Sequence, residues 1–139
     1  MIIGFTGTRN DLTEVQLRNI IAGLMELGEG WEGLHGDCVG ADDVFDKCCK
    51  ELGIVTKCRP CTFTNMRAYA TEAIAEPVRP MERNRQIVAD CDHLFACPPT
   101  EEEVKRSGTW ATIRFGRKAN KPVTIFYPSG KIEQCLVSG

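Results

Sequence analysis

The stretch Ile2-Ile3-Gly4-Phe5-Thr6-Gly7-Thr8-Arg9 decides the fold class, because it joins a short apolar run to a tight loop that contains glycine. An uninterrupted apolar run of this length is typical of a strand that is buried on both faces. Thr13 and Gln16 then have the spacing of a capping box at a helix start. Apolar residues follow at helical spacing, at Leu17, Ile20, Ile21 and Leu24. The opening of the chain therefore predicts a strand, a loop and an amphipathic helix.

The same unit recurs along the rest of the chain. We expect strands at Gly33–His35, Ile54–Cys58, His93–Cys97 and Pro122–Phe126, and helices at Ala41–Leu52, Met81–Ala89 and Ser107–Lys118. The connection 59–80 loses this periodicity, and we expect a helical piece in it at Met66–Ala75. A connection of this length is usually functional or mobile. The tail from Pro128 onward is expected to add an edge strand.

Strands that alternate with helices imply right-handed crossovers and a parallel sheet covered on both faces. The expected fold class is therefore α/β, a Rossmann-like three-layer sandwich with a central parallel sheet in the order 3-2-1-4-5. We expect one nucleotide-binding domain over residues 1–139. In such sheets ligands lie beyond the carboxyl ends of the strands, at the switch point between strands one and four.

Composition excludes several classes of protein. The 17 Lys and Arg against 19 Asp and Glu leave a net charge of −2, so the overall positive charge of a dedicated nucleic-acid binder is missing and any anion site is local. No apolar run approaches the ~20 residues of a membrane span, and Met1-Ile2-Ile3 lacks the basic start of a signal peptide. We therefore expect a cytoplasmic protein without a membrane partner.

Cysteine usage favours free thiols over disulfides or metal. Eight cysteines in 139 residues fall below the ~8–10% of a small disulfide scaffold. Cys58 and Cys61 have the C-x-x-C spacing of a zinc or redox site, but a second ligand pair at matching spacing is missing. We expect two unconnected thiols, no metal and no cofactor.

Four segments are expected at the carboxyl edge of the sheet: 7–9, 36–40, 79–85 and 106–109. Two of them are glycine-containing turns that lead into helix N-termini, where unpaired N–H groups and the helix dipole attract an anion. Neither turn is a G-x-G-x-x-G or Walker motif, so ordinary NAD binding and NTPase chemistry are not indicated.

Arginines concentrate in or beside these segments. Seven of the ten arginines are Arg9, Arg59, Arg67, Arg79, Arg83, Arg85 and Arg106. A guanidinium group suits a bidentate grip on phosphate. The alternative is that Arg83 or Arg85 pairs with Glu82 or Asp90 in a surface network.

Three carboxylates and one histidine need separate interpretations. Asp37 and Asp42 either cap the helix that follows them or accept hydrogen bonds from ribose hydroxyls. Glu82 is a third acid, beside Arg83. His35 lacks a Cys or Ser partner in the sequence, so a structural role is the simpler interpretation, and no nucleophile–base pair is recognisable.

Taken in order, the motifs at 6–9, 36–42, 83–88 and 106–112 resemble the SLOG superfamily of Rossmann-like nucleotide-binding domains, and most closely its small YspA-type members. The segments at 83–85 and 106–109 also resemble the DNA-processing protein A (DprA) family, whose Rossmann domain binds single-stranded DNA. With the edge argument, the resemblance implies a set of ligand-binding residues: Gly7, Thr8, Arg9, Gly36, Asp37, Gly40, Asp42, Arg83, Asn84, Arg85, Arg106, Ser107, Gly108 and Thr109. Because members of this superfamily are often homodimers, the resemblance also implies a homodimer for this chain.

Lonely-guy phosphoribohydrolases, another branch, carry a catalytic glutamate where this chain has Thr112. A hydroxyl cannot replace a carboxylate at a developing oxocarbenium centre. We therefore expect a module that binds a nucleotide-derived ligand, as a sensor or sequestering domain. An N-glycosidase that uses Glu82, Asp37 or Asp42 is one alternative. Single-stranded DNA binding, with Phe63, Tyr69 and Trp110 stacking on bases, is the other.

Overall fold

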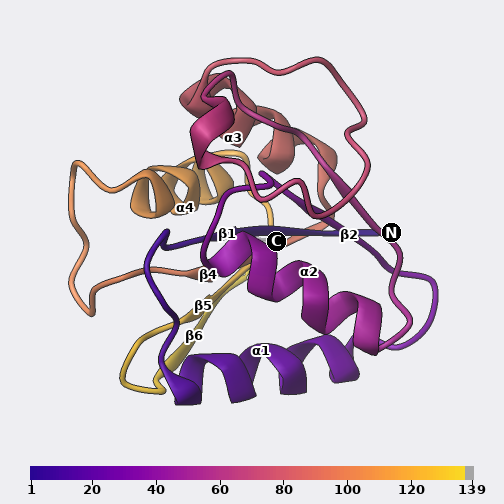
Figure 1. Ribbon diagram of the computed structural model, residues 1–139. Coiled ribbons are helices and arrows are strands. Elements are labelled where there is room, and N and C mark those ends of the chain that lie inside the picture. Colours follow the sequence, from indigo (N-terminus) through magenta and orange to yellow (C-terminus); the bar gives the residue numbers. More distant parts are fainter. Residues whose placement is uncertain (137–139) are drawn as a thin grey trace.

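The strands form a single six-stranded sheet in the order β3-β2-β1-β4-β5-β6, with helices on both faces (Figure 1). This computed structural model describes residues 1–136. The strands are β1 (Ile2–Gly7), β2 (Glu32–His35), β3 (Thr56–Cys58), β4 (His93–Cys97), β5 (Val123–Phe126) and β6 (Ile132–Cys135). The first five are parallel, and β6 pairs with β5 in the antiparallel direction. The expected fold class and strand order are confirmed, as is the edge strand at the C-terminal end.

The helices are α1 (Glu14–Glu26), α2 (Ala41–Glu51), α3 (Pro80–Asp90) and α4 (Gly108–Lys118), with a short 3-10 helix, η1 (Thr64–Met66). Figure 1 shows α1 and α2 on one face of the sheet and α3 and α4 on the other. Thr13 and Gln16 form the expected capping box at the start of α1. None of the described helices is long and apolar enough to cross a membrane.

Two apolar clusters hold the three layers together. Between the sheet and α1 and α2, the buried side chains include Ile3, Phe5, Ile20, Phe45 and Phe126. Between the sheet and α3 and α4, they include Leu34, Ile87, Leu94, Trp110 and Ile113. The strands are therefore covered on both faces, as their continuous apolar runs predict.

The expected helical piece at Met66–Ala75 is wrong. Only η1 is helical in the long connection between β3 and α3. The cause is Asp37, whose carboxylate accepts hydrogen bonds from the backbone N–H groups of Tyr69 and Ala70. Tyr69 also has a φ of 53°, which ends any right-handed helix. A side chain from a distant turn therefore takes the N–H groups that a helix would need.

The third strand begins two residues later than the sequence predicts, at Thr56 instead of Ile54. The backbone N–H of Ile54 donates to the carbonyl of Cys49 and so belongs to the end of α2. The apolar side chain of Ile54 predicts that the residue is at least partly buried, but it does not predict which backbone group its N–H will bind.

Candidate functional site

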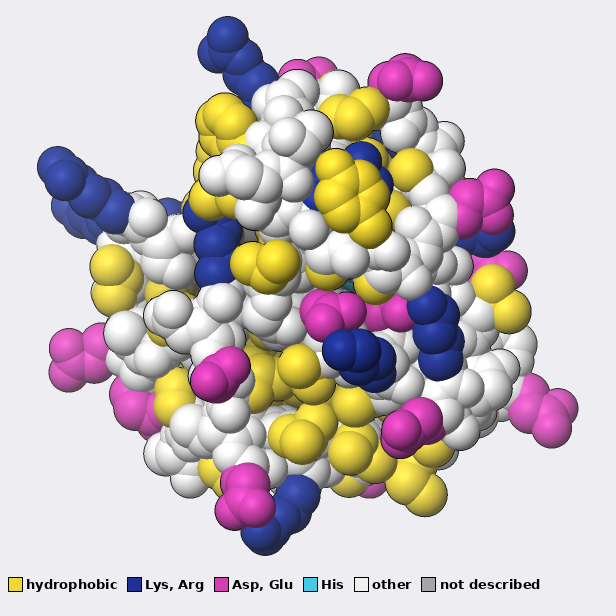
Figure 2. All heavy atoms as spheres, in the orientation of Figure 1, with side chains coloured by type: hydrophobic (Ala, Val, Ile, Leu, Met, Phe, Trp, Pro, Cys, Tyr) yellow, Lys and Arg dark blue, Asp and Glu magenta, His cyan; other side chains and the backbone are white. Residues whose placement is uncertain are grey.

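A cleft of about 390 Å³ lies beyond the carboxyl ends of β1 and β2 and against the first turns of α3 and α4. Its walls are Phe5, Thr6, Gly7, Thr8, Arg9, Gly36, Cys38, Asp42, Pro80, Met81, Arg83, Asn84, Ile87, Pro99, Arg106, Ser107, Gly108 and Thr109. β1 and β4 are neighbours although they are far apart in the sequence, so the cleft lies at the expected switch point. Figure 2 shows Lys and Arg side chains at the left of this face, on the side where β1 and β4 end in Figure 1.

The start of α4 forms one end of the cleft. Ser107 caps the helix by accepting a hydrogen bond from the backbone N–H of Trp110, at 3.2 Å. The N–H groups of the first helical turn have no carbonyl partner within the helix, so they favour an anion in front of them. Arg9 and Arg106 are exposed side chains that line the same cleft. The cleft therefore combines a helix N-terminus with two solvated cations among its lining residues.

Arg83 lies in the cleft wall and is only 4% exposed. Its guanidinium donates hydrogen bonds to the carbonyl of Gly36, at 2.6 Å, and to Oδ1 of Asn84, at 2.7 Å. It also contacts the sulfur of Cys38. Gly36 has to be small here, because a Cβ would lie 2.5 Å from a guanidinium nitrogen of Arg83. Arg83 thus ties the turn after β2 to α3 and presents a buried positive charge to the cleft.

The structure separates Arg85 from Arg83. The Arg85 guanidinium lies over the ring of Phe115, 4.5 Å from its centroid, and does not line the cleft. Residues two apart on a helix point to different faces, which explains the separation. The alternative surface network is not formed either: Asp90 pairs with Arg59. The joint phosphate grip expected from Arg83 and Arg85 is therefore missing.

Asp42 is the one carboxylate among the described residues that line the cleft. It is buried, and its Oδ2 accepts a hydrogen bond from the backbone N–H of Cys38, at 3.1 Å. Burial raises the pKa of the Asp42 carboxyl, against the lowering effect of His35 and Arg83. The other two acids considered from the sequence lie elsewhere, since neither Asp37 nor Glu82 lines the cleft.

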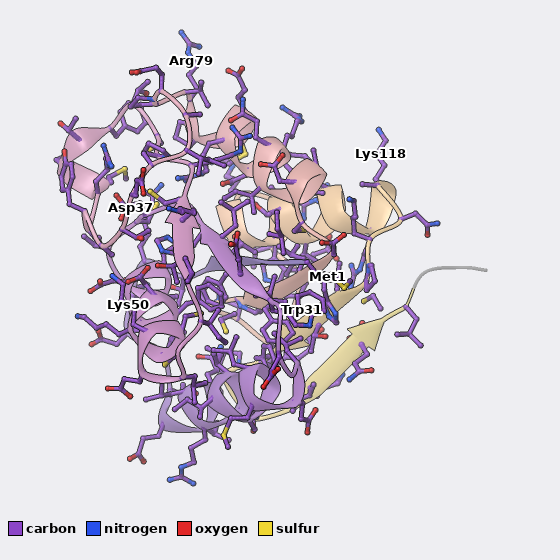
Figure 3. The ribbon with its side chains drawn as sticks, turned by 90° about the vertical axis from the view of Figure 1, so that its right-hand side faces the viewer. Met1, Trp31, Asp37, Lys50, Arg79 and Lys118 are labelled. Carbon is purple, nitrogen blue, oxygen red and sulfur yellow. The ribbon has the colours of Figure 1, made fainter. Side chains whose placement is uncertain are left out.

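Asp37 is fully buried and holds the connection between β3 and α3. Its carboxylate accepts hydrogen bonds from Nε of Arg67, at 3.0 Å, and from the backbone N–H groups of Tyr69 and Ala70, at 3.2 and 2.9 Å. Figure 3 shows Asp37 and Trp31 at opposite ends of β2. These contacts occupy the carboxylate, so it fixes the connection in place and does not line the cleft.

Gly40 also supports the cleft without lining it. Its φ is 94°, and a Cβ would lie 2.5 Å from the carbonyl oxygen of Arg9. The next residue, Ala41, donates its backbone N–H to the carbonyl of Thr8, at 2.9 Å. Only glycine allows the turn after β2 to approach the loop after β1 this closely.

His35 has a structural role beneath the cleft. The backbone N–H of Asp37 donates to Nδ1 of His35, at 2.8 Å, so the ring proton lies on Nε2 and faces Oδ1 of Asp46, at 2.9 Å. Nζ of Lys50 contacts the other oxygen of Asp46, at 2.7 Å. Every polar atom of the ring has a partner, and His35 does not line the cleft.

The cysteines are all free thiols. Cys58 and Cys61 are both buried, and burial raises the pKa of Cys58 to about 12. No group of three or more potential metal ligands occurs among residues 1–136.

Cleft residues that sequence reasoning missed are mostly apolar: Phe5, Pro80, Met81, Ile87 and Pro99. Pro80 and Met81 belong to the segment 79–85 that the sequence places at this edge, and that position was the available signal. Cys38 was also missed as a lining residue, although the turn that carries it was singled out.

No family model matches the chain, and no curated protein does. Solved structures that share its fold include three that illustrate the range of identity. The molybdenum cofactor binding protein from the phototrophic bacterium Rippkaea orientalis is 26% identical, with a TM-score of 0.71 over 91% of this chain and 76% of that one. TM1055, a structural-genomics target, is 15% identical, with a TM-score of 0.64 over 88% of this chain and 71% of that one.

DNA processing protein A from Helicobacter pylori, described for its single-stranded DNA binding mode, is 20% identical, with a TM-score of 0.64. The match covers 90% of this chain but 64% of the Helicobacter chain, so this chain spans less than two thirds of that neighbour. The three neighbours are consistent with a SLOG-type, Rossmann-like fold.

Proposed function

We propose that the cleft binds a small, phosphate-bearing molecule derived from a nucleotide. The observation that carries the proposal is the meeting of Arg9 and Arg106 with the N-terminus of α4 in one cleft of a chain whose net charge is −2. A helix start provides N–H donors and a favourable dipole, and guanidinium groups add charge-assisted hydrogen bonds. The ligand phosphate would lie in front of Ser107, Gly108 and Thr109.

Asp42 gives the proposed ligand a direction. A carboxylate repels phosphate but accepts hydrogen bonds from hydroxyl groups. The sugar of a nucleotide would therefore lie toward Asp42 and Thr8, both of which line the cleft. Two of the structural neighbours, which bind a cofactor and single-stranded DNA, support ligand binding as a use of this fold.

We propose binding without hydrolysis. Thr112, which stands where Lonely-guy enzymes have their glutamate, is fully buried, and its hydroxyl donates to the carbonyl of Gly108, at 2.8 Å. The side chain at this position is therefore occupied within α4 and does not line the cleft. A sensor or sequestering module, which binds its ligand without turning it over, agrees with this arrangement.

The test is calorimetry with ribose 5-phosphate and the four common nucleoside 5′-monophosphates. Arg106→Ala is expected to weaken binding by at least about tenfold, because a charge-assisted hydrogen bond contributes about 1.5–3 kcal/mol. Arg85→Ala is the matched control and should bind as the unmodified protein does, since Arg85 lies over Phe115.

Two outcomes would contradict the proposal. The first is a failure of binding: either no phosphorylated probe binds the unmodified protein, or Arg106→Ala and Arg85→Ala lose affinity for the probes equally. The second is release of free base during incubation with the monophosphates, measured by chromatography. That result would replace the binding module with an N-glycosidase.

A further inference from the structure

Tyr69 is an exposed aromatic residue in an unusual backbone conformation. The residue is 62% exposed, and its backbone φ is 53°. The left-handed region is unfavourable for a bulky aromatic residue, and such conformations persist only where the surroundings enforce them. Tyr69 therefore combines an enforced backbone conformation with large exposure to solvent.

Three contacts enforce this conformation. The buried carboxylate of Asp37 accepts hydrogen bonds from the backbone N–H groups of Tyr69 and Ala70. The same carboxylate pairs with Arg67, whose guanidinium carbon lies 4.2 Å from the centroid of the Tyr69 ring. One face of the ring is therefore covered by a cation that is itself anchored to a buried acid. The backbone of Tyr69 is fixed by Asp37, one face of its ring is covered by Arg67, and the residue remains largely exposed.

The segment that carries Tyr69 is joined to a wall of the cleft, although Tyr69 itself does not line it. Cys38 lines the cleft and forms an antiparallel bridge with Arg67. Val39, the next residue, donates its backbone N–H to the carbonyl of Met66, at 2.9 Å. The segment that carries Tyr69 is thus joined directly to the turn that forms the cleft wall. It is the same turn that carries Asp37, which binds the backbone of Tyr69.

We propose that the exposed face of Tyr69 stacks on the base of the ligand, so that the site selects ligands with a planar heterocycle over phosphorylated sugars alone. This inference rests on the proposed function and adds a base subsite to it. A ring already fixed in position loses little freedom when a base stacks on it, and base–aromatic stacking tolerates any base. The guanidinium of Arg67 behind the ring adds a cation to the stack.

The other aromatic candidates are less suited to this role. Trp110 is buried, and its indole N–H donates to the hydroxyl of Thr100, at 3.1 Å, so the stacking role expected for it is wrong. Phe63 is exposed, at 52%, but precedes η1 and has no ring or cation contact among the interactions described for residues 1–136. Phe63 therefore serves as the matched control for Tyr69.

The experiment compares AMP with ribose 5-phosphate by calorimetry. Tyr69→Ala is expected to weaken AMP binding at least about fivefold, the lower limit of a base–aromatic stack, and to leave ribose 5-phosphate binding within about twofold. Tyr69→Phe keeps the ring and should bind AMP within about twofold of the unmodified protein. Phe63→Ala should do the same. Melting curves check that each variant is folded.

A second readout does not depend on the loss of affinity. Tyr69→Trp places an indole in the proposed stack, so AMP should quench its fluorescence relative to the unmodified protein, while ribose 5-phosphate should not.

The inference is overturned if Tyr69→Ala binds AMP normally while Arg106→Ala does not, a result that leaves the proposed function intact. It is also overturned if Phe63→Ala loses as much affinity for AMP as Tyr69→Ala does, or if a dT oligonucleotide, titrated in the same way, is weakened by Tyr69→Ala while AMP is not. If neither AMP nor ribose 5-phosphate binds the unmodified protein, the proposed function fails as well.

Discussion

Ser107 has two separable properties, because it caps α4 and also lines the cleft. Aspartate is as good an N-cap as serine but adds a negative charge at the expected phosphate position. We predict that Ser107→Asp keeps the free energy of unfolding within about 0.5 kcal/mol. The affinity for ribose 5-phosphate should fall by about tenfold or more, because like charges in a partly buried site repel by over 1 kcal/mol.

Urea denaturation and calorimetry on the same preparation check the two parts of this prediction. Normal affinity for ribose 5-phosphate in Ser107→Asp would place the phosphate away from α4. A large loss of stability would instead mean that the cap does not tolerate a carboxylate.

Single residues were predictable where their partners are close in the sequence. The Thr13 and Gln16 capping box and the Ser107 cap depend on residues three positions away, so their spacing is sufficient. Arg83 was predicted to reach the cleft, but its partner, the carbonyl of Gly36, is 47 positions away. Such a contact has no signature in the sequence, and it makes Arg83 a structural as well as a binding residue.

At the scale of elements, Asp46 on α2 is held by His35 on β2 and by Lys50 one turn along α2. Burial alone would raise the pKa of Asp46, but hydrogen bonds from His35, Lys50 and Thr56 outweigh it, and the pKa falls below its usual 3.8. A lowered pKa means that the charged form stabilises the fold above about pH 4 and that this contribution is lost as the pH falls further.

We predict that Asp46→Asn lowers the free energy of unfolding by about 2 kcal/mol at pH 7, the contribution of a hydrogen bond to a charged group. The difference from the unmodified protein should shrink at pH 3, because the Asp46 carboxyl of the unfolded chain then takes up a proton near its usual pKa of 3.8, while the folded protein, with its lowered pKa, keeps the carboxylate charged. Urea denaturation at both pH values measures it. A difference that is equal at pH 7 and pH 3 would show that the charge of Asp46 does not contribute.

Regular elements were predictable, and the long connection was not. Apolar runs that alternate with amphipathic helices predict parallel strands joined by right-handed crossovers, and the strand order is the one expected for the Rossmann-like class. The connection between β3 and α3 is shaped by Asp37, which lies at least 30 positions before the Arg67, Tyr69 and Ala70 atoms that it binds. Residue propensity favoured a helix there, and a tertiary contact prevented it.

At the scale of the whole molecule, seven of the eight thiols are buried and only Cys135 is partly accessible. Burial raises the pKa of Cys38 to about 11 and that of Cys49 to about 12. Since the thiolate is the reactive form, these thiols are protected by both burial and protonation. We predict that a thiol reagent at pH 8 labels one cysteine rapidly in the native protein and eight in denaturant.

Mass spectrometry of the labelled peptides identifies the reactive site, and Cys135→Ser should abolish the rapid phase. Rapid labelling of Cys38, which lines the cleft, would contradict this picture, because it would require the thiol to lose its hydrogen-bonded environment beside Arg83.

The walls of the cleft come from five stretches of chain that come together only in the folded protein. The unfolded chain therefore has no comparable site, and occupancy adds directly to the free energy of folding, by about 2.7 kcal/mol at a ligand concentration one hundred times Kd. If the proposed ligand occupies the cleft, its concentration would therefore set how strongly each copy of the protein resists unfolding and proteolysis.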